Sequence, residues 1–216
     1  MVHRTRYLSY VAVCLAIAAG LGAALIARRA SPALPDLAGG SLIEPNTRVP
    51  EFSLLDHHGK PFTNTNLLGR WSMLYFGYTN CPDFCPATLS MLAAMERRMR
   101  AAGAPLVPQV VFVSADALRD TPAQLASYVP YFDADFLGVT APDQATIEAF
   151  ASGLNVAVAI NRRAGGSYTV DHSSAILVID PKGRLDAVLT GPFSAPAVEA
   201  DFRLVTDQYA RMNGRS

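Results

Sequence analysis

Two apolar runs separated by an amphipathic segment constrain the fold of this chain more than any other feature. Residues 71–76 (WSMLYF) and 107–114 (VPQVVFVS) have the length and the nearly continuous apolar character of buried strands. Between them, residues 87–100 place apolar side chains at three-and-four spacing, which predicts a helix (Leu89, Leu92, Met95 and Met99). Strand, helix and strand in this order predict a parallel pair joined by a right-handed crossover, and therefore an α/β fold.

The rest of the chain supplies further strands and helices for such a sheet. Turn residues between two short apolar segments predict an N-terminal hairpin over residues 52–63. Further strands are expected at residues 136–139, 155–161, 174–180 and 185–190. Helix-capping sequences lie at residues 121–124 and 140–143, and a last helix is expected over residues 195–212. We therefore expect one domain, residues 48–216, with a central sheet flanked by helices.

The N-terminal segment predicts a membrane anchor. Residues 7–27 carry no charge and are long enough to cross a hydrocarbon core as one helix, with two arginines on each side (Arg4, Arg6, Arg28 and Arg29). This run exceeds the hydrophobic length of a cleaved signal peptide, so residues 1–30 are predicted to be an uncleaved transmembrane signal anchor. Residues 31–47, rich in proline, glycine and small polar residues, are predicted to be a flexible tether.

Orientation and compartment follow from the same segment. Positive charge next to a membrane span favours the cytoplasmic side, and the arginines on the two flanks nearly cancel in this respect. The free amino terminus adds positive charge to the short lead, which favours a cytoplasmic N-terminus with the domain outside the cytoplasm. The short lead lacks the serine-rich amphipathic character of a mitochondrial transit peptide. We therefore expect a single-pass protein of a bacterial inner membrane, with its domain in the periplasm.

The charge balance argues against a nucleic-acid partner. The chain contains 18 lysine and arginine residues against 18 aspartate and glutamate residues. No basic cluster with interleaved aromatic residues is present in the sequence, so the electrostatic signature of nucleic-acid binding is missing.

Cys81 and Cys85 lie between the first apolar run and the helix that follows it. Residues four apart lie on one face of a helix, so the two thiols can converge on one ion or form a disulfide. The positive end of the helix dipole is expected to lower the pKa of these thiols and favour the thiolate form. At this point the pair is compatible with a redox couple, half of a zinc site or a copper site.

His172 is the candidate third ligand, because a loop that enters an antiparallel strand can lie beside the start of the cysteine-bearing helix. Two thiolates and an imidazole suit copper, whereas structural zinc usually needs four protein ligands. His57 and His58 are expected to face solvent in a turn. Asp171 is expected to be a surface acid and Asp83 a helix-start residue.

Several segments resemble the Sco/SenC family in order and register. They are residues 76–86 (FGYTNCPDFCP), the segment of Ser114, Asp116 and residues 119–122 (RDTP), residues 168–173 (YTVDHS) and residues 179–183 (IDPKG). The resemblance covers about residues 48–210. Two positions depart from the family pattern: Ala117 follows Asp116 where the family often has proline, and Asn80 stands where it often has histidine.

The resemblance implies a thioredoxin-like fold and a role in delivering copper to the dinuclear copper A centre of cytochrome c oxidase subunit II. It implies Cys81, Cys85 and His172 as ligands for Cu(I) and Cu(II), and an upstream copper donor. The alternative is a thiol-disulfide oxidoreductase in which Cys81 and Cys85 reduce the copper-ligating cysteines of the same target. Three residues separate these cysteines where redox motifs usually have two, so the sequence favours a metallochaperone without deciding whether the protein is also an enzyme.

Overall fold

The computed structural model describes residues 16–17, 20–22, 36–43, 47–163 and 165–214. Two compact units are distinguished, Met1–Pro35 and Asp36–Ser216, and the second contains the fold described below. Most of the predicted anchor, residues 7–27, lies outside the described residues. Among the stretches that the structure describes, no helix combines the length and apolar character needed to cross a membrane.

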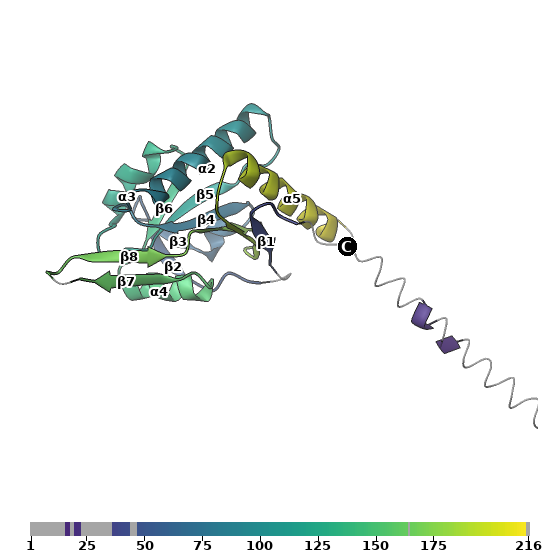
Figure 1. Cartoon of the computed structure of the whole chain (residues 1–216), viewed down its shortest axis with the longest axis horizontal. Helices are drawn as coiled ribbons and strands as arrows, with labels where there is room; N and C mark the ends of the chain where they lie inside the picture. Colours follow the sequence, from purple (N-terminus) through teal and green to yellow (C-terminus); the bar gives the residue numbers. More distant parts are fainter. Residues whose placement is uncertain (1–15, 18–19, 23–35, 44–46, 164, 215–216) are drawn as a thin grey trace, which may run out of the picture. The chain divides into compact units, whose positions relative to one another are not determined.

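The fold is a mixed eight-stranded sheet in the order β1-β10-β9-β4-β5-β6-β2-β3 (Figure 1). Its strands are β1 (Gly40–Leu42), β2 (Ser53–Asp56), β3 (Pro61–Thr63), β4 (Ser72–Gly77), β5 (Gln109–Ser114), β6 (Leu137–Thr140), β9 (Ala175–Ile179) and β10 (Leu185–Thr190). β4 pairs in parallel with β5, and β5 with β6, whereas β9 runs antiparallel to β4. The predicted parallel crossover and the β2–β3 hairpin are thus confirmed.

Helices cover both faces of this sheet (Figure 1). They are α2 (Phe84–Ala101), α3 (Pro122–Tyr128), α4 (Gln144–Gly153) and α5 (Ala195–Asn213), with short 3-10 helices at Asn64–Leu67 and Val129–Tyr131. Alternation along β4 divides the core between the faces. Met73 and Tyr75 pack with residues of α2, α3 and α5, whereas Leu74 and Phe76 pack with residues of α4 and the hairpin. β4 is buried on both faces, as its continuous apolar sequence predicts.

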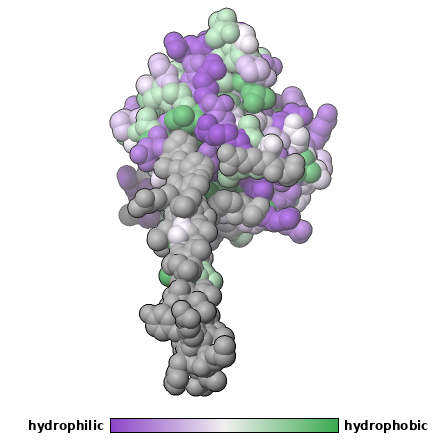
Figure 2. All heavy atoms as spheres, turned by 90° about the vertical axis from the view of Figure 1, so that its right-hand side faces the viewer, coloured by the Kyte–Doolittle hydropathy of each residue, from purple (hydrophilic) through white to green (hydrophobic). Residues whose placement is uncertain are grey.

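Figure 2 shows one face of the domain, and this face is mainly polar. Hydrophilic residues predominate there, and hydrophobic ones are scattered among them. This distribution agrees with a domain whose apolar side chains are largely used in its two core clusters.

Some boundaries differ from the sequence predictions. Residues 40–42, predicted as part of the tether, form β1 on the edge of the sheet beside β10. The Asp201 carboxylate accepts hydrogen bonds from the backbone N–H groups of Ala38 and Gly39, at 2.7 and 3.1 Å, and so fixes the approach to this strand. The second difference is the start of α4, where Asp143 and not Thr140 is the N-cap, because Thr140 is buried at the end of β6.

A second, two-stranded sheet carries the C-terminal candidate residue. β7 (Val158–Arg162) pairs antiparallel with β8 (Tyr168–His172), and Val158 lies opposite His172. β7 begins three residues later than expected, after Asn155 takes a positive φ of 56° beyond the end of α4. His172 was expected in a loop and is instead the last residue of β8, immediately before the chain enters β9.

Candidate metal centre

The end of β4 brings the chain to the cysteine loop through a glycine. A Cβ atom added at Gly77 would lie 2.6 Å from a ring carbon of Phe112 and 3.0 Å from Cys85 Sγ. Contacts this short do not occur for real Cβ atoms, so only glycine lets the backbone pass here without displacing its neighbours. The last residue of the buried strand therefore determines how closely the Cys85 thiol approaches the sheet.

Cys81 lies in the loop just before α2, and Cys85 lies within the helix. Asp83 is the N-cap of this helix, and Cys85 is in its first turn. The backbone N–H of Cys85 donates to Cys81 Sγ at 3.4 Å. Both cysteines are free thiols, with Cys85 fully buried and Cys81 partly exposed. The two sulfur atoms lie close together as predicted, although Cys81 precedes the helix and does not lie on its face.

His172 completes a cluster of three donor atoms. Its Nε2 lies 3.5 Å from Cys85 Sγ, and the donor atoms of Cys81, Cys85 and His172 all lie within 4.8 Å of one another. Its Nδ1 lies 3.2 Å from the backbone carbonyl oxygen of Ser173. A carbonyl only accepts, so Nδ1 carries the hydrogen and the lone pair of Nε2 faces the thiols. The rings of Tyr75 and Tyr78 contact the imidazole edge-on, at centroid distances of 6.2 and 5.9 Å.

Burial determines the protonation of Cys85 and His172. Burial raises the pKa of Cys85 to about 12, and the neighbouring Cys81 thiol adds to this effect. The expectation that the helix N-terminus lowers the thiol pKa is therefore wrong for Cys85, because desolvation of a thiolate outweighs the helix dipole there. Burial also lowers the pKa of His172, so its imidazole is neutral at pH 7. Neutral imidazole is the form that binds metals.

The two acidic residues near the cluster have the roles that the sequence favours. Asp171 is exposed, and its carboxylate accepts a hydrogen bond from Asn161 Nδ2 at 2.6 Å on the neighbouring strand. Asp83 is exposed at the helix start, and its side chain accepts no capping hydrogen bond. Neither supplies a donor atom to the three-residue cluster.

His57 is buried, which contradicts the expectation that it faces solvent. Its Nδ1 accepts a hydrogen bond from the backbone N–H of Gly138 at 2.9 Å, and its Nε2 lies 3.0 Å from Nε2 of the exposed His58. Because Nδ1 accepts, the neutral ring carries its hydrogen on Nε2 and donates it to His58. This arrangement leaves His57 no free lone pair for a metal, and the ring instead joins the hairpin turn to β6.

Tyr75, Tyr78 and Tyr168 were not identified as site residues from the sequence. Tyr75 and Tyr78 flank the imidazole, and the Tyr168 hydroxyl donates to the buried carboxylate of Asp116 in the loop after β5. Tyr78 and Tyr168 lie in the segments that resemble the Sco/SenC family, which is the signal that marks them, whereas Tyr75 lies in the buried strand before the first of these segments. Their contacts depend on strands that are distant in sequence, so local pattern did not reveal them.

Comparison with known proteins gives one family. The family model described as SCO1/SenC matches residues 41–207. The bovine protein named mitochondrial SCO2 homolog is 36% identical over 183 residues, which covers 83% of this chain and 67% of that protein. The mouse protein of the same name is 38% identical over 134 residues, which is 62% of this chain and about half, 52%, of that protein.

A solved structure shares the fold closely. The crystal structure of Arabidopsis thaliana ScoI with copper bound has a TM-score of 0.69 and 30% identity, and the match covers 74% of this chain and 98% of that one. A TM-score of this size over nearly the whole of the solved chain indicates the same arrangement of sheet and helices.

Proposed function

The chain belongs to the SCO1/SenC family, and from this premise we propose that it is a copper metallochaperone that supplies cytochrome c oxidase subunit II with copper for its dinuclear copper A site. Cys81, Cys85 and His172 hold one copper ion as cargo. The copper comes from an upstream donor and passes to the target by exchange of ligands.

The observation that carries the proposal is the convergence of two sulfur donors and one imidazole nitrogen within 4.8 Å. Thiolates are soft ligands that favour Cu(I), and imidazole suits both Cu(I) and Cu(II). Binding replaces the proton on each thiol by the metal, and the released protons go to solvent. Three protein ligands leave room for an incoming ligand from the partner, which a transfer reaction needs.

We further propose that residues 1–30 anchor the protein in a bacterial inner membrane with the domain in the periplasm. The support is the uncharged run at residues 7–27. An anchored donor and a membrane-embedded acceptor diffuse in the same plane, which favours encounters between them. A C-terminal reporter that is active only in the cytoplasm would contradict this orientation.

Copper titration of the full chain under reducing conditions tests the site. We expect one copper per chain, and loss of this binding in the double variant Cys85→Ser with His172→Ala. The chain offers matched controls, because Cys14→Ser and His58→Ala change the same residue types outside the three-residue cluster. Copper binding that survives the double variant, or that both controls abolish, would rule out this site.

A thiol-disulfide oxidoreductase is the second candidate, favoured by two free thiols that lie close together, with Cys81 partly exposed. The Cys81 thiolate would attack a target disulfide and release one target thiolate. The Cys85 thiolate would then attack Cys81 Sγ, release the second target thiol and leave a Cys81–Cys85 disulfide, so that two electrons pass to the target. The raised pKa of Cys85 opposes this second step, because little thiolate is present at neutral pH.

The two candidates are separated by parallel assays with the same target domain. One assay mixes metal-free reduced protein with the oxidised target and follows target thiols. The other mixes copper-loaded protein with the reduced target and follows transfer of the metal. Rapid thiol exchange without copper transfer would favour the oxidoreductase and count against the metallochaperone.

A further inference from the structure

The three candidate ligands are contributed by separate parts of the fold. Cys81 and Cys85 follow β4 in the central sheet, whereas His172 ends β8 in the two-stranded sheet. Within the described residues, no strand of the two-stranded sheet pairs with a strand of the central sheet. The short link from His172 to β9, which pairs with β4, places the end of β8 beside the cysteine loop, and other contacts restrain the start of β8.

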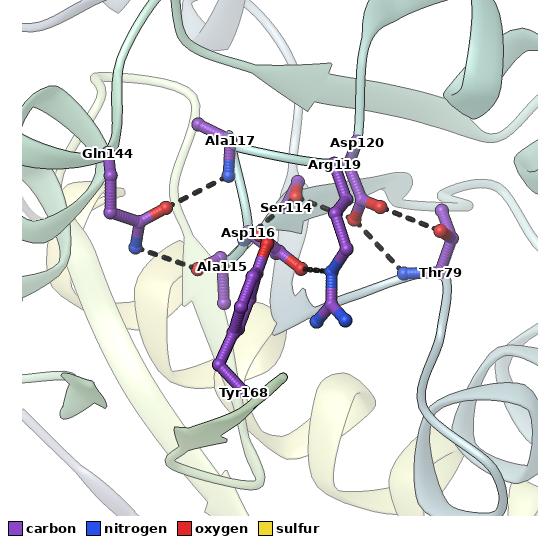
Figure 3. A network of polar contacts seen from close by, with 9 residues as sticks. All are labelled: Thr79, Ser114, Ala115, Asp116, Ala117, Arg119, Asp120, Gln144 and Tyr168. Carbon is purple, nitrogen blue, oxygen red and sulfur yellow. Dashed lines mark hydrogen bonds and ion pairs between the residues drawn. The ribbon is translucent and has the colours of Figure 1, made fainter. Parts of the chain in front are cut away.

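Residues 114–120, which are the last residue of β5 and the loop after it, make the first set of these contacts, and these contacts hold the cysteine loop (Figure 3). The buried Asp120 carboxylate accepts hydrogen bonds from the backbone N–H of Thr79 at 3.0 Å and from its hydroxyl at 2.6 Å. Ser114 Oγ donates to the same carboxylate at 2.7 Å. Thr79 lies two residues before Cys81, so this carboxylate fixes the approach to the first thiol.

The same loop also holds β8. Tyr168, the first residue of β8, donates from its hydroxyl to the buried Asp116 carboxylate at 2.8 Å. The Arg119 guanidinium forms an ion pair with that carboxylate and lies over the Tyr168 ring, 4.0 Å from its centroid. Tyr168 therefore meets the loop with both its hydroxyl and its ring face.

Ser114 joins the two sets of contacts. The backbone N–H of Asp116 donates to Ser114 Oγ at 3.0 Å, and Ser114 Oγ donates in turn to Asp120. Asp116 and Asp120 are both fully buried, and a buried carboxylate is costly unless its hydrogen bonds are complete. The Ser114 hydroxyl thus joins the Asp120 carboxylate, which holds the cysteine loop, to the backbone of Asp116, whose carboxylate holds β8.

Gln144 at the start of α4 fixes this loop from the other side. Its side-chain oxygen accepts from the backbone N–H of Ala117 at 3.0 Å, and its side-chain nitrogen donates to the carbonyl of Ala115 at 3.0 Å (Figure 3). A proline at position 117 has no N–H and could not make the first bond. In this chain a side-chain clamp therefore restrains the loop at the position where Sco/SenC proteins often have proline.

We propose that the loop of residues 114–120 is a positioning bracket that sets the distance between the cysteine pair and His172. Asp116, Arg119 and Tyr168 hold the histidine side, and Thr79 and Asp120 hold the cysteine side. The inference rests on the proposed function for its consequence, since the distance that the bracket sets determines copper affinity. The distance between the cysteine pair and His172 can be tested in the metal-free protein.

Tyr168→Phe is the most selective test, because it removes one hydroxyl and keeps the ring under Arg119. Groups that hydrogen-bond a metal ligand typically contribute about 10-fold to 100-fold in affinity, and because Tyr168 acts on His172 only through β8, we expect a loss at the lower end, about 10-fold. Tyr131→Phe is the matched control, since Tyr131 is 85% exposed and distant from the loop in sequence. It should bind copper as the wild type does.

Two further measurements separate positioning from general stability. In the metal-free full chain, the NMR resonances of the His172 ring should shift or broaden in Tyr168→Phe and stay unchanged in Tyr131→Phe. In the Cu(II) form, the nitrogen hyperfine coupling in the electron paramagnetic resonance spectrum should weaken. A merely structural role would lower the unfolding midpoint and leave both signals of the folded protein unchanged.

Arg119→Lys provides a second variant in case Tyr168→Phe folds poorly. It keeps the positive charge and loses the planar group that pairs with Asp116 and covers Tyr168, so it should reproduce the NMR and copper effects. Unchanged His172 resonances and copper affinity within twofold of the wild type, in either folded variant, would overturn the bracket. A wild-type protein that binds no copper would refute the proposed function alone, because the metal-free NMR comparison would still decide on the bracket.

Discussion

Copper binding should strengthen steeply as the pH rises, because a proton competes with the metal for Cys85. The pKa of Cys85 is raised to about 12, so below that pH the free protein carries the thiol and the copper form carries the thiolate. Each pH unit then changes the apparent dissociation constant about tenfold through this residue, or roughly 1.4 kcal/mol. Between pH 7 and 9 the affinity for Cu(I) should rise about 100-fold or more.

His172 should not contribute to this pH dependence. Its pKa is lowered from 6.5 by burial, so the imidazole is already neutral across the range from pH 7 to 9. It adds a second competing proton only where the pH falls below its lowered pKa. The slope above pH 7 therefore reports on the thiols.

Competition with a Cu(I) chelator of known affinity, repeated at each pH, measures this slope. Calorimetry in buffers of different ionisation enthalpy counts the released protons independently. Cys85→Ser should reduce the count by one proton per copper, and Cys14→Ser should leave it unchanged. Equal affinities at pH 7 and 9 would show that Cys85 is either already a thiolate or not a ligand, and would refute the reasoning.

Three further predictions concern stability. The pKa of the buried Glu96 is raised by desolvation from 4.5 to about 7, so the folded state binds this proton more tightly than the unfolded chain. The free energy of unfolding should then fall by up to about 3 kcal/mol as the pH rises from 4.5 to 7. In urea titrations, the free energy of unfolding of Glu96→Gln should depend less on pH than that of the wild type. An identical pH dependence in the two proteins would contradict this. Gly77→Ala forces Phe112 to move and should cost about 1 to 3 kcal/mol in urea unfolding, together with weaker copper binding; wild-type stability would refute the close contact. His57→Ala leaves the N–H of Gly138 without its acceptor and should cost about 1 to 3 kcal/mol, whereas His58→Ala at the exposed ring should cost much less; equal losses would disprove the buried role of His57.

The core of the fold was predictable because its signals are local. The buried strand before Cys81, the amphipathic helix after it and the next buried strand each extend over a short window and form as predicted. Thr121 caps α3 as its sequence predicts, accepting from Gln124 N–H at 3.2 Å. Thr140 failed as a helix cap because β6 uses its backbone in the sheet, where pairing with distant strands outweighs the local capping preference.

Most of the predicted anchor lies outside the residues that the structure describes, so it stays a prediction from hydropathy, whereas part of the predicted tether forms β1. The copper-binding roles of Cys81, Cys85 and His172 also stay predictions until copper is titrated. What the structure adds is that the three donor atoms are close enough to share one ion.

The sequence by itself determined that two cysteines separated by three residues stand at a helix start, but it did not show that Cys81 lies before the helix and not on its face. Only the tertiary structure decided how His172, 87 residues after Cys85, reaches that helix start and which loop restrains it there. It also decided the direction of the Cys85 pKa shift, because desolvation depends on side chains packed around the thiol from other elements. Periodicity and spacing report contacts along one element, whereas burial and the meeting of two sheets depend on how all the elements pack.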